Sequence, residues 1–185
     1  MDDFDPEQEH VMSILEPYLD QIYRIFPEAM KTYNSIDSKI TADHEDRTAA
    51  GCVRDHAWMS FQSNFGGTPG FHFLEVRGMQ VLNIKDRVVL RVKKVDANGN
   101  HRNYPTQQQI DFDNQVDLVG LPPAATRVIV GYQPDAAFSE VQRVIIRRPK
   151  GLWVSQIVDI DEIVAWVDIS QKQLPFGNTG RAVKR

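Results

Sequence analysis

The chain has 185 residues, a formal net charge of −4, 42% hydrophobic residues and 25% charged residues, which is ordinary usage for one globular domain. It has no run of eighteen apolar residues, no apolar leader after its acidic start, and a single cysteine, Cys52. We therefore expect no membrane span, no secretory signal, no internal disulfide and a cytoplasmic location.

The charge is divided unevenly along the chain. Residues 1–50 hold twelve acidic and four basic side chains, whereas residues 51–185 hold thirteen acidic and seventeen basic ones. Such asymmetry indicates either that the acidic part screens a basic surface or that the two parts face different partners.

The first part of the chain, residues 1–66, has helical patterns. Asp5-Pro6-Glu7 has the residue types of a helix start, and apolar residues then recur at helical spacing through Phe26. Pro17 should kink or divide this helix. A second helix is predicted from about Thr41 to Phe65, ended by a Gly-rich break.

A β-hairpin is predicted over residues 74–95. Two β-branched runs, 79–84 and 88–92, flank the turn-prone segment 85–87. With a three-residue loop, the apolar residues of both runs share one face, and Arg91 and Lys93 point to the other. Gly78 is a candidate bulge site that could shift this register.

Further strands follow the hairpin. Thr106 and Gln109 match a capping box, which predicts a short inserted helix. Residues 126–132, 141–148 and 152–158 predict an antiparallel meander, while 161–167 fit either a helix or a strand.

The order of these elements predicts the fold class and the domain organisation. Helices come first and strands afterwards, so the fold class is α+β: two N-terminal helices packed on an antiparallel sheet of about five strands. We expect one domain over 1–170, with a helical part (1–66) and a sheet part (70–170), and a loose basic tail over 171–185.

Basic residues around the predicted hairpin and turns form a candidate binding surface. They are Arg77, Arg91, Lys93, Lys94, Arg102, Arg143, Arg147, Arg148 and Lys150. Arginine suits phosphate through its planar fork, which favours nucleic acid or an acidic partner. The alternative is that these charges solvate a sheet face and cover strand edges.

A metal-dependent nuclease is the alternative function. Such enzymes place carboxylates and a lysine on a hairpin, where Mg²⁺ bridges phosphate and water. Glu75, Asp86 and Lys93 could form this set, which resembles that of the PD-(D/E)xK nucleases. Arg91, however, stands where that family carries its glutamate, and Asp86 falls in the predicted turn.

Other chemistry has little sequence support. Cys52 and His56 lie four residues apart on one helix face, but Asp55 would point about 100° away and could not orient the imidazole. The histidines have no ligand spacing, so we expect no metal site, no catalytic residues and no cofactor beyond the Mg²⁺ of the alternative.

Several strings of the second half resemble uncharacterised proteins of toxin–antitoxin or phage-defence loci in bacteria and phages. The strings are LRVKKVD, NYPTQQ, FDNQ, LPPAATRVIVGYQPD and WVDI, and the resemblance covers about residues 70–170. It implies a small bacterial protein that acts by macromolecular contact, with a partner protein or with nucleic acid.

Overall fold

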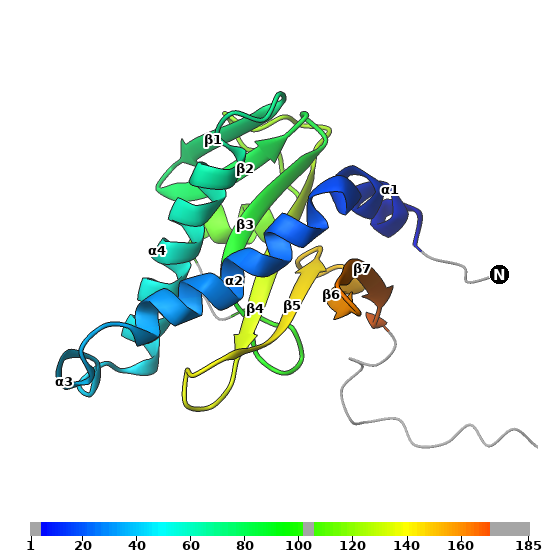
Figure 1. The fold of residues 1–185 in the computed structure, drawn as a ribbon. Coiled ribbons are helices and arrows are strands. Elements are labelled where there is room, and N and C mark those ends of the chain that lie inside the picture. Colours follow the sequence, from blue (N-terminus) through cyan, green and yellow to red (C-terminus); the bar gives the residue numbers. More distant parts are fainter. Residues whose placement is uncertain (1–4, 102–105, 171–185) are drawn as a thin grey trace, which may run out of the picture.

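The structure is a computed structural model that describes residues 5–101 and 106–170. A mixed sheet of seven strands, in the order β1 to β7, lies at its centre (Figure 1). The helices are α1 (Pro6–Leu15), the 3-10 turn η1 (Glu16–Tyr18), α2 (Leu19–Asn34), α3 (Ser38–Thr41), α4 (Asp46–Phe65) and α5 (Gln107–Asp113). The strands are β1 (Phe71–Val76), β2 (Met79–Ile84), β3 (Val88–Lys94), β4 (Thr126–Pro134), β5 (Val141–Arg147), β6 (Val154–Ile160) and β7 (Ile163–Asp168).

The N-terminal helices begin and break where their residues predict. The Asp5 carboxylate accepts hydrogen bonds from the backbone amides of Glu7 (2.8 Å) and Gln8 (3.4 Å), and so caps α1. Pro17 lies in η1, which divides α1 from α2, because proline cannot donate the next helical hydrogen bond. The second predicted helix is shorter than expected, since α4 begins at Asp46 and α3 precedes it.

The predicted β2–β3 hairpin is confirmed with its register. Leu82 pairs with Leu90 and Ile84 with Val88 across the three-residue turn at 85–87. These four residues belong to the apolar core under the helices. Gly78 is not a bulge: with φ of +77° it forms, with Arg77, the two-residue turn between β1 and β2.

The sheet differs from the expected one in size and in one pairing. It has seven strands within the described residues rather than about five, because β1 and β7 extend it at its ends. β3 and β4 pair in parallel, whereas the other neighbours are antiparallel. The segment between them, which contains α5, crosses one face of the sheet and returns the chain to the same direction.

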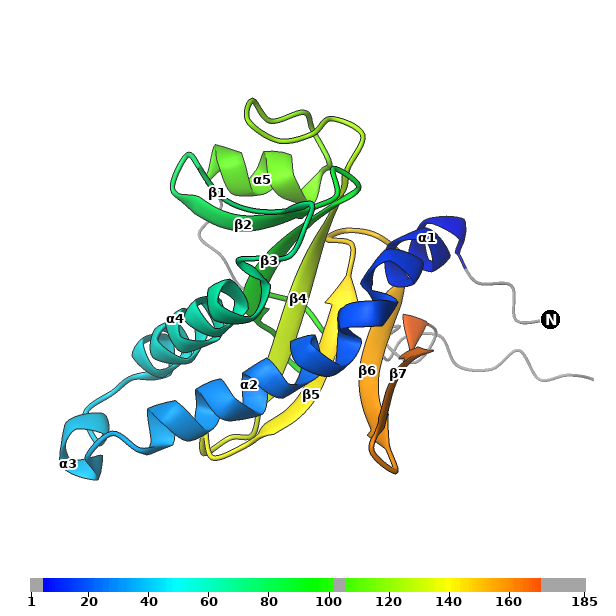
Figure 2. The ribbon, with the colours of Figure 1, turned by 45° about the horizontal axis from the view of Figure 1, so that its top comes forward.

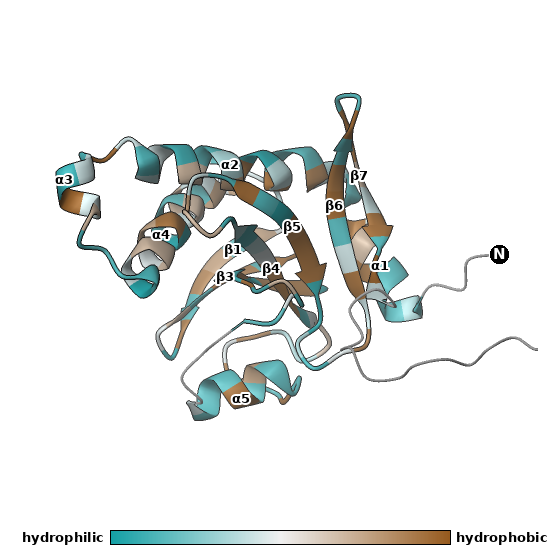
Figure 3. Cartoon of the chain, turned by 90° about the horizontal axis from the view of Figure 1, so that it is seen from below, coloured by the Kyte–Doolittle hydropathy of each residue, from teal (hydrophilic) through white to brown (hydrophobic). Residues whose placement is uncertain are grey.

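The two faces of the sheet are covered by different elements. Figures 1 and 2 show α2 and α4 packed on one face, and Figure 3 shows α5 on the opposite side of the sheet. The helix-side core includes Phe26, Phe61 and Tyr132, while the smaller core on the other face includes Phe112, Ile129 and Ile145. The hydroxyl of Tyr132 donates to the carbonyl of Ala50 (3.0 Å), which ties β4 to α4.

At the far end of the sheet, β6 and β7 form a projecting hairpin (Figure 2). Trp166 and Val164 point to the helix-side core. Gln8 on α1 links the base of the hairpin to the helices by donating to Ser155 (3.0 Å) and Asp168 (3.1 Å). The predicted meander is thus present, and the undecided segment 161–167 contributes its last strand.

Candidate functional site

Arg91 lies on the predicted face of β3 but not at the surface. Helix α5 covers this face, so Arg91 is 8% exposed instead of facing solvent as expected. Its guanidinium donates to the side-chain carbonyl of Gln109 and lies 5.2 Å from the centre of the Phe112 ring. Burial lowers the pKa of Arg91 to about 10, because the charged form loses hydration.

Lys93 lies two residues further along β3 on the same face and is partly buried. Burial, and after it the charges of Arg91 and Arg54, lower the pKa of Lys93 to about 8, whereas Asp113 acts in the opposite direction. A lysine near other cations and away from water is therefore held closer to neutrality than an exposed one.

Arg54 on α4 contacts β2 on the helix-covered face of the sheet. The pairing of β2 with β3 ends at Leu82 and Leu90, so the two strands part beside Arg91. Arg54 donates to the side-chain carbonyl of Gln80 on β2 (3.2 Å) and also contacts the neighbouring Asp55.

A small polar network on α5 lies beside Arg91. Gln109 donates to Asp113 (2.6 Å), and His101 lies 3.4 Å from the same carboxylate. The side chains of His101 and Asp113 are 11% and 15% exposed. The carboxylate of Asp113 favours the charged forms of both Arg91 and Lys93.

The remaining residues of the predicted basic surface are dispersed. Arg143 donates to Gln133 and the Ala97 carbonyl, and Arg147 to Gly99 and Asn100, so both hold the 96–100 turn against the sheet. Their role is structural, and they do not form one face with the hairpin.

Four other residues of the predicted basic surface lie in different parts of the structure, and a fifth lies outside the described residues. Arg148 pairs with Glu7 (3.3 Å), and Lys150 donates to Asn114 (2.9 Å). Lys94 lies 3.8 Å from Asp46 and 4.5 Å from the centre of the Phe138 ring. Arg77 is exposed in the β1–β2 turn, and Arg102 lies outside the described residues.

The three residues of the nuclease alternative do not converge. Asp86 lies in the turn before β3 and accepts from Asn83 (2.7 Å), seven residues from Lys93, or about 23 Å along an extended chain. Glu75 is exposed on β1 and alternates with Leu74, which packs in the α5-side core. Within residues 5–101 and 106–170, no group of three or more histidine, cysteine or acidic residues could hold a metal ion.

Sequence reasoning missed several residues of these buried groups. Gln109 and Asp113 both act on Arg91, and their positions depend on how α5 packs rather than on a local motif. Arg127 on β4 is 1% exposed, with its nearest ion-pair partner, Asp117, 3.9 Å away. Burial lowers the pKa of Arg127.

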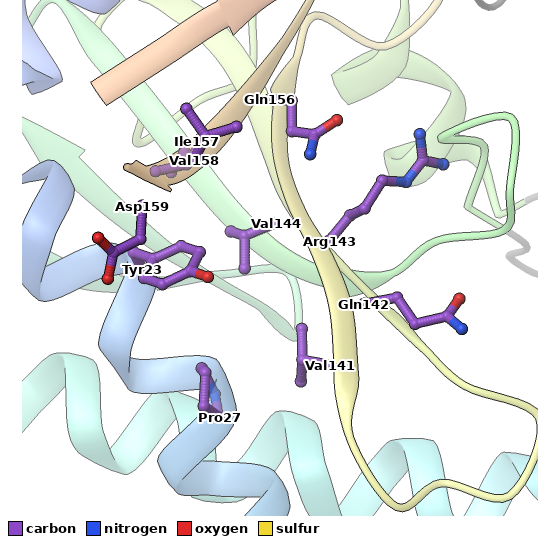
Figure 4. Close-up of a pocket in the computed structure, with 10 residues that line it drawn as sticks. All are labelled: Tyr23, Pro27, Val141, Gln142, Arg143, Val144, Gln156, Ile157, Val158 and Asp159. Carbon is purple, nitrogen blue, oxygen red and sulfur yellow. The ribbon is translucent and has the colours of Figure 1, made fainter. Parts of the chain in front are cut away.

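A cleft opens where β5 and β6 part. Their pairing ends at Val144 and Ile157, and a cavity of about 200 Å³ follows. Tyr23 and Pro27 of α2 line it from the helix side, with residues of the two strands as its walls (Figure 4).

The outer face of the β6–β7 hairpin carries exposed apolar side chains. Ile160 and Ile163 pair across the hairpin and are 57% and 70% exposed, and Val167 is 40% exposed. Val158 and Ala165 form the next pair on this face. The turn at the tip adds two exposed acids, Asp161 and Glu162. We refer to these apolar residues and tip acids together as the hairpin surface.

No family model, curated protein or solved structure matches the chain. The fold is that of an α+β protein with a mixed seven-stranded sheet. Within the described part of the chain, no helix has the length and apolar character needed to cross a bilayer.

Proposed function

We propose that the protein acts by binding a partner protein through the hairpin surface. The observation that carries this proposal is the exposure of Ile160, Ile163 and Val167 on one side of a projecting hairpin. Contiguous exposed apolar side chains are typical of protein interfaces. β7 also ends the sheet, and an end strand offers backbone groups to a further strand.

The charges around this surface indicate the kind of partner. Asp161 and Glu162 would repel the phosphates of a nucleic acid but would attract basic side chains. We therefore propose a partner that contributes an extended apolar segment flanked by basic residues. The resemblance to toxin–antitoxin and phage-defence proteins suggests the biological setting, a cytoplasmic pair in which this chain acts by contact.

Purification of the tagged protein from its native host tests this function. We expect a stoichiometric protein to remain attached to the wild type and to be lost from Ile163→Glu, because the new carboxylate places charge in the apolar face. Ile40→Glu is the matched control, since Ile40 is 60% exposed on α3, away from the hairpin. Equal retention by both variants would contradict the proposal, as would the recovery of nucleic acid without protein.

The alternative, a Mg²⁺-dependent nuclease, has less support because Asp86 lies in the turn before β3 and Glu75 lies on the face of the sheet opposite to Lys93. Incubation of purified protein with DNA and RNA in Mg²⁺ or Mn²⁺ decides this point. Cleavage that is lost in Lys93→Ala would favour the enzyme over the binding protein.

A further inference from the structure

We propose that the cleft between β5 and β6 binds an arginine side chain of the partner protein. This inference rests on the proposed function, which takes the partner to carry basic residues beside its apolar segment. The cleft adjoins the hairpin surface, because Val158 belongs to both. The partner would therefore contact the hairpin with apolar side chains and place one arginine in the cleft.

The cleft is formed where two strands separate beside helix α2. β5 and β6 pair only as far as Val144 and Ile157. Beyond this point, β5 pairs with β4 alone and β6 with β7 alone. The cavity of about 200 Å³ is smaller than the roughly 300 Å³ at which sites for small-molecule ligands usually begin. Its size suits one long side chain better than a nucleotide.

Apolar groups on the helix side of the cleft suit the stem of such a side chain. Val144 and Ile157 are buried in the helix-side core, while Val141 and Tyr23 are half-buried and pack against it. All four line the cleft (Figure 4). The methylene groups of arginine cover apolar surface of this kind while the charged end stays among polar groups.

The polar groups on the same side suit the charged end, because they accept hydrogen bonds. Asp159 lines the cleft and pairs with Val164, so its exposed carboxylate lies on the helix side of β6. Pro27 has no N–H to donate to the carbonyl of Tyr23 one turn earlier in α2. The ring of Tyr23 adds a face on which a guanidinium can stack. Arginine fits better than lysine, since its planar fork can meet a carboxylate through two hydrogen bonds.

Two arginines of the chain lie close to the cleft, but neither is an ion-pair partner of Asp159. Arg143 extends to the other side of β5 (Figure 4), where it donates to Gln133 (2.7 Å) and to the Ala97 carbonyl. Arg24 pairs with Asp20 (2.8 Å), which is the main cause of its raised pKa, and Asp159 is a smaller one. The carboxylate of Asp159 is therefore available to a cation from outside the chain.

NMR titration with the acetylated and amidated tripeptide Val-Arg-Val tests the cleft directly. We expect this peptide to shift the methyl signals of Val141 and Val144, and the neutral peptide Val-Gln-Val to leave them in place. Asp159→Asn should weaken the binding of Val-Arg-Val by about tenfold, as expected for the loss of one charge-assisted contact. Asp43→Asn is the matched control, since Asp43 is exposed between α3 and α4, and it should bind as the wild type does.

A second variant blocks the cleft without changing its charge. Val141→Trp places a large side chain in the cavity and should abolish the binding of Val-Arg-Val, while an unchanged Tm would show that the fold is kept. Equal affinity of Asp159→Asn and wild type for the peptide, or no shift at Val141 and Val144, would overturn the proposal.

The complex isolated from the native host separates this inference from the proposed function. If both hold, Ile163→Glu and Asp159→Asn each lose partner, and Ile163→Glu still binds Val-Arg-Val. Loss of partner from Ile163→Glu but not from Asp159→Asn would overturn the role of the cleft and keep the hairpin interface. Peptide binding in the cleft, with partner retained by Ile163→Glu, would overturn the hairpin interface instead. A molecular mass that rises with protein concentration, except in Asp159→Asn, would assign the arginine to a second copy and overturn the assignment to a partner protein.

Discussion

The two faces of the sheet are built on different physical principles. On the helix side, alternate strand residues such as Leu82, Leu90 and Val130 are apolar and buried under α2 and α4. On the α5 side, Arg91 and Arg127 share the strands with Val89 and Ile129. One face is stabilised mainly by removing apolar area from water, and the other also has to accommodate charge.

This difference explains where the connecting segments lie. The arginines of the second face donate to the turn at 96–100 and to Gln109, so the crossover between β3 and β4 is held by polar contacts. On the helix side, the Tyr132 hydroxyl bond to Ala50 also joins β4 to α4, but the covering helices pack mainly through apolar side chains. We infer that changes on the first face act mainly on stability, while changes on the second face can alter charge and binding with a smaller loss.

The largest effect is expected on the helix side from Phe26→Ala. Phe26 is fully buried, with its ring 5.6 Å from Tyr132 and 6.0 Å from Phe61. Its truncation should lower the free energy of unfolding by about 3–5 kcal/mol, since it removes apolar burial and leaves a cavity. Urea denaturation measures this loss. Met59→Ala is the control, because Met59 is 62% exposed on α4, and a comparable loss there would contradict the comparison.

An intermediate effect is expected on the other face from Arg91→Ala. This change removes the partner of the Gln109 carbonyl and the stem that packs near Phe112, at a cost of about 2–3 kcal/mol. Arg91→Met should be close to neutral, because it keeps the stem and removes a buried charge. A Met variant as unstable as the Ala variant would show that the guanidinium itself stabilises this face.

The strands of the helix-side face were predictable because the pattern of apolar residues that specifies them is local in the sequence. Leu82 and Ile84 alternate with polar positions on β2, and Val88 and Leu90 continue the pattern after a three-residue turn. Period-two alternation therefore specified both the hairpin and its register. The N-terminal cap of α5 was also predictable from local sequence: the Thr106 hydroxyl accepts a hydrogen bond from the Gln109 backbone amide (3.4 Å).

The α5 side was not predictable, because its contacts join residues that are distant in sequence. Gln109 lies eighteen residues from Arg91, and no local pattern indicates that α5 returns over β3. The parallel pairing of β3 with β4 depends on the same crossover. The β6–β7 hairpin was not predictable either. Its turn holds Asp161 and Glu162 at φ of 52° and 68°, whereas glycine or asparagine usually marks such a turn in a sequence.

The smallest expected effect is the pH dependence of stability that Lys93, on the α5 side, contributes. Lys93 has a pKa of about 8 in the folded protein against 10.5 for the ordinary side chain. Between these values the unfolded chain binds a proton that the folded one does not, so the contribution of Lys93 to stability rises with pH over this window. Below pH 8 Lys93 is charged in the folded protein, and the cost of burying its ammonium is fully present. The charges of Arg91 and Arg54 add to this cost, and the charge of Asp113 reduces it.

Lys93→Met should therefore be more stable than the wild type at pH 7 in phosphate-free buffer, by at most about 2 kcal/mol. Urea denaturation at pH 7, 8, 9 and 9.5 should show this difference shrink, because the wild-type lysine loses its charge and with it the repulsion. Lys31→Met provides the control, since an exposed lysine has no such penalty to lose. A difference between wild type and Lys93→Met that stays constant with pH would mean that burial and the neighbouring arginines do not lower the pKa of Lys93. The contrast between the two faces would then be limited to Arg91 and Arg127.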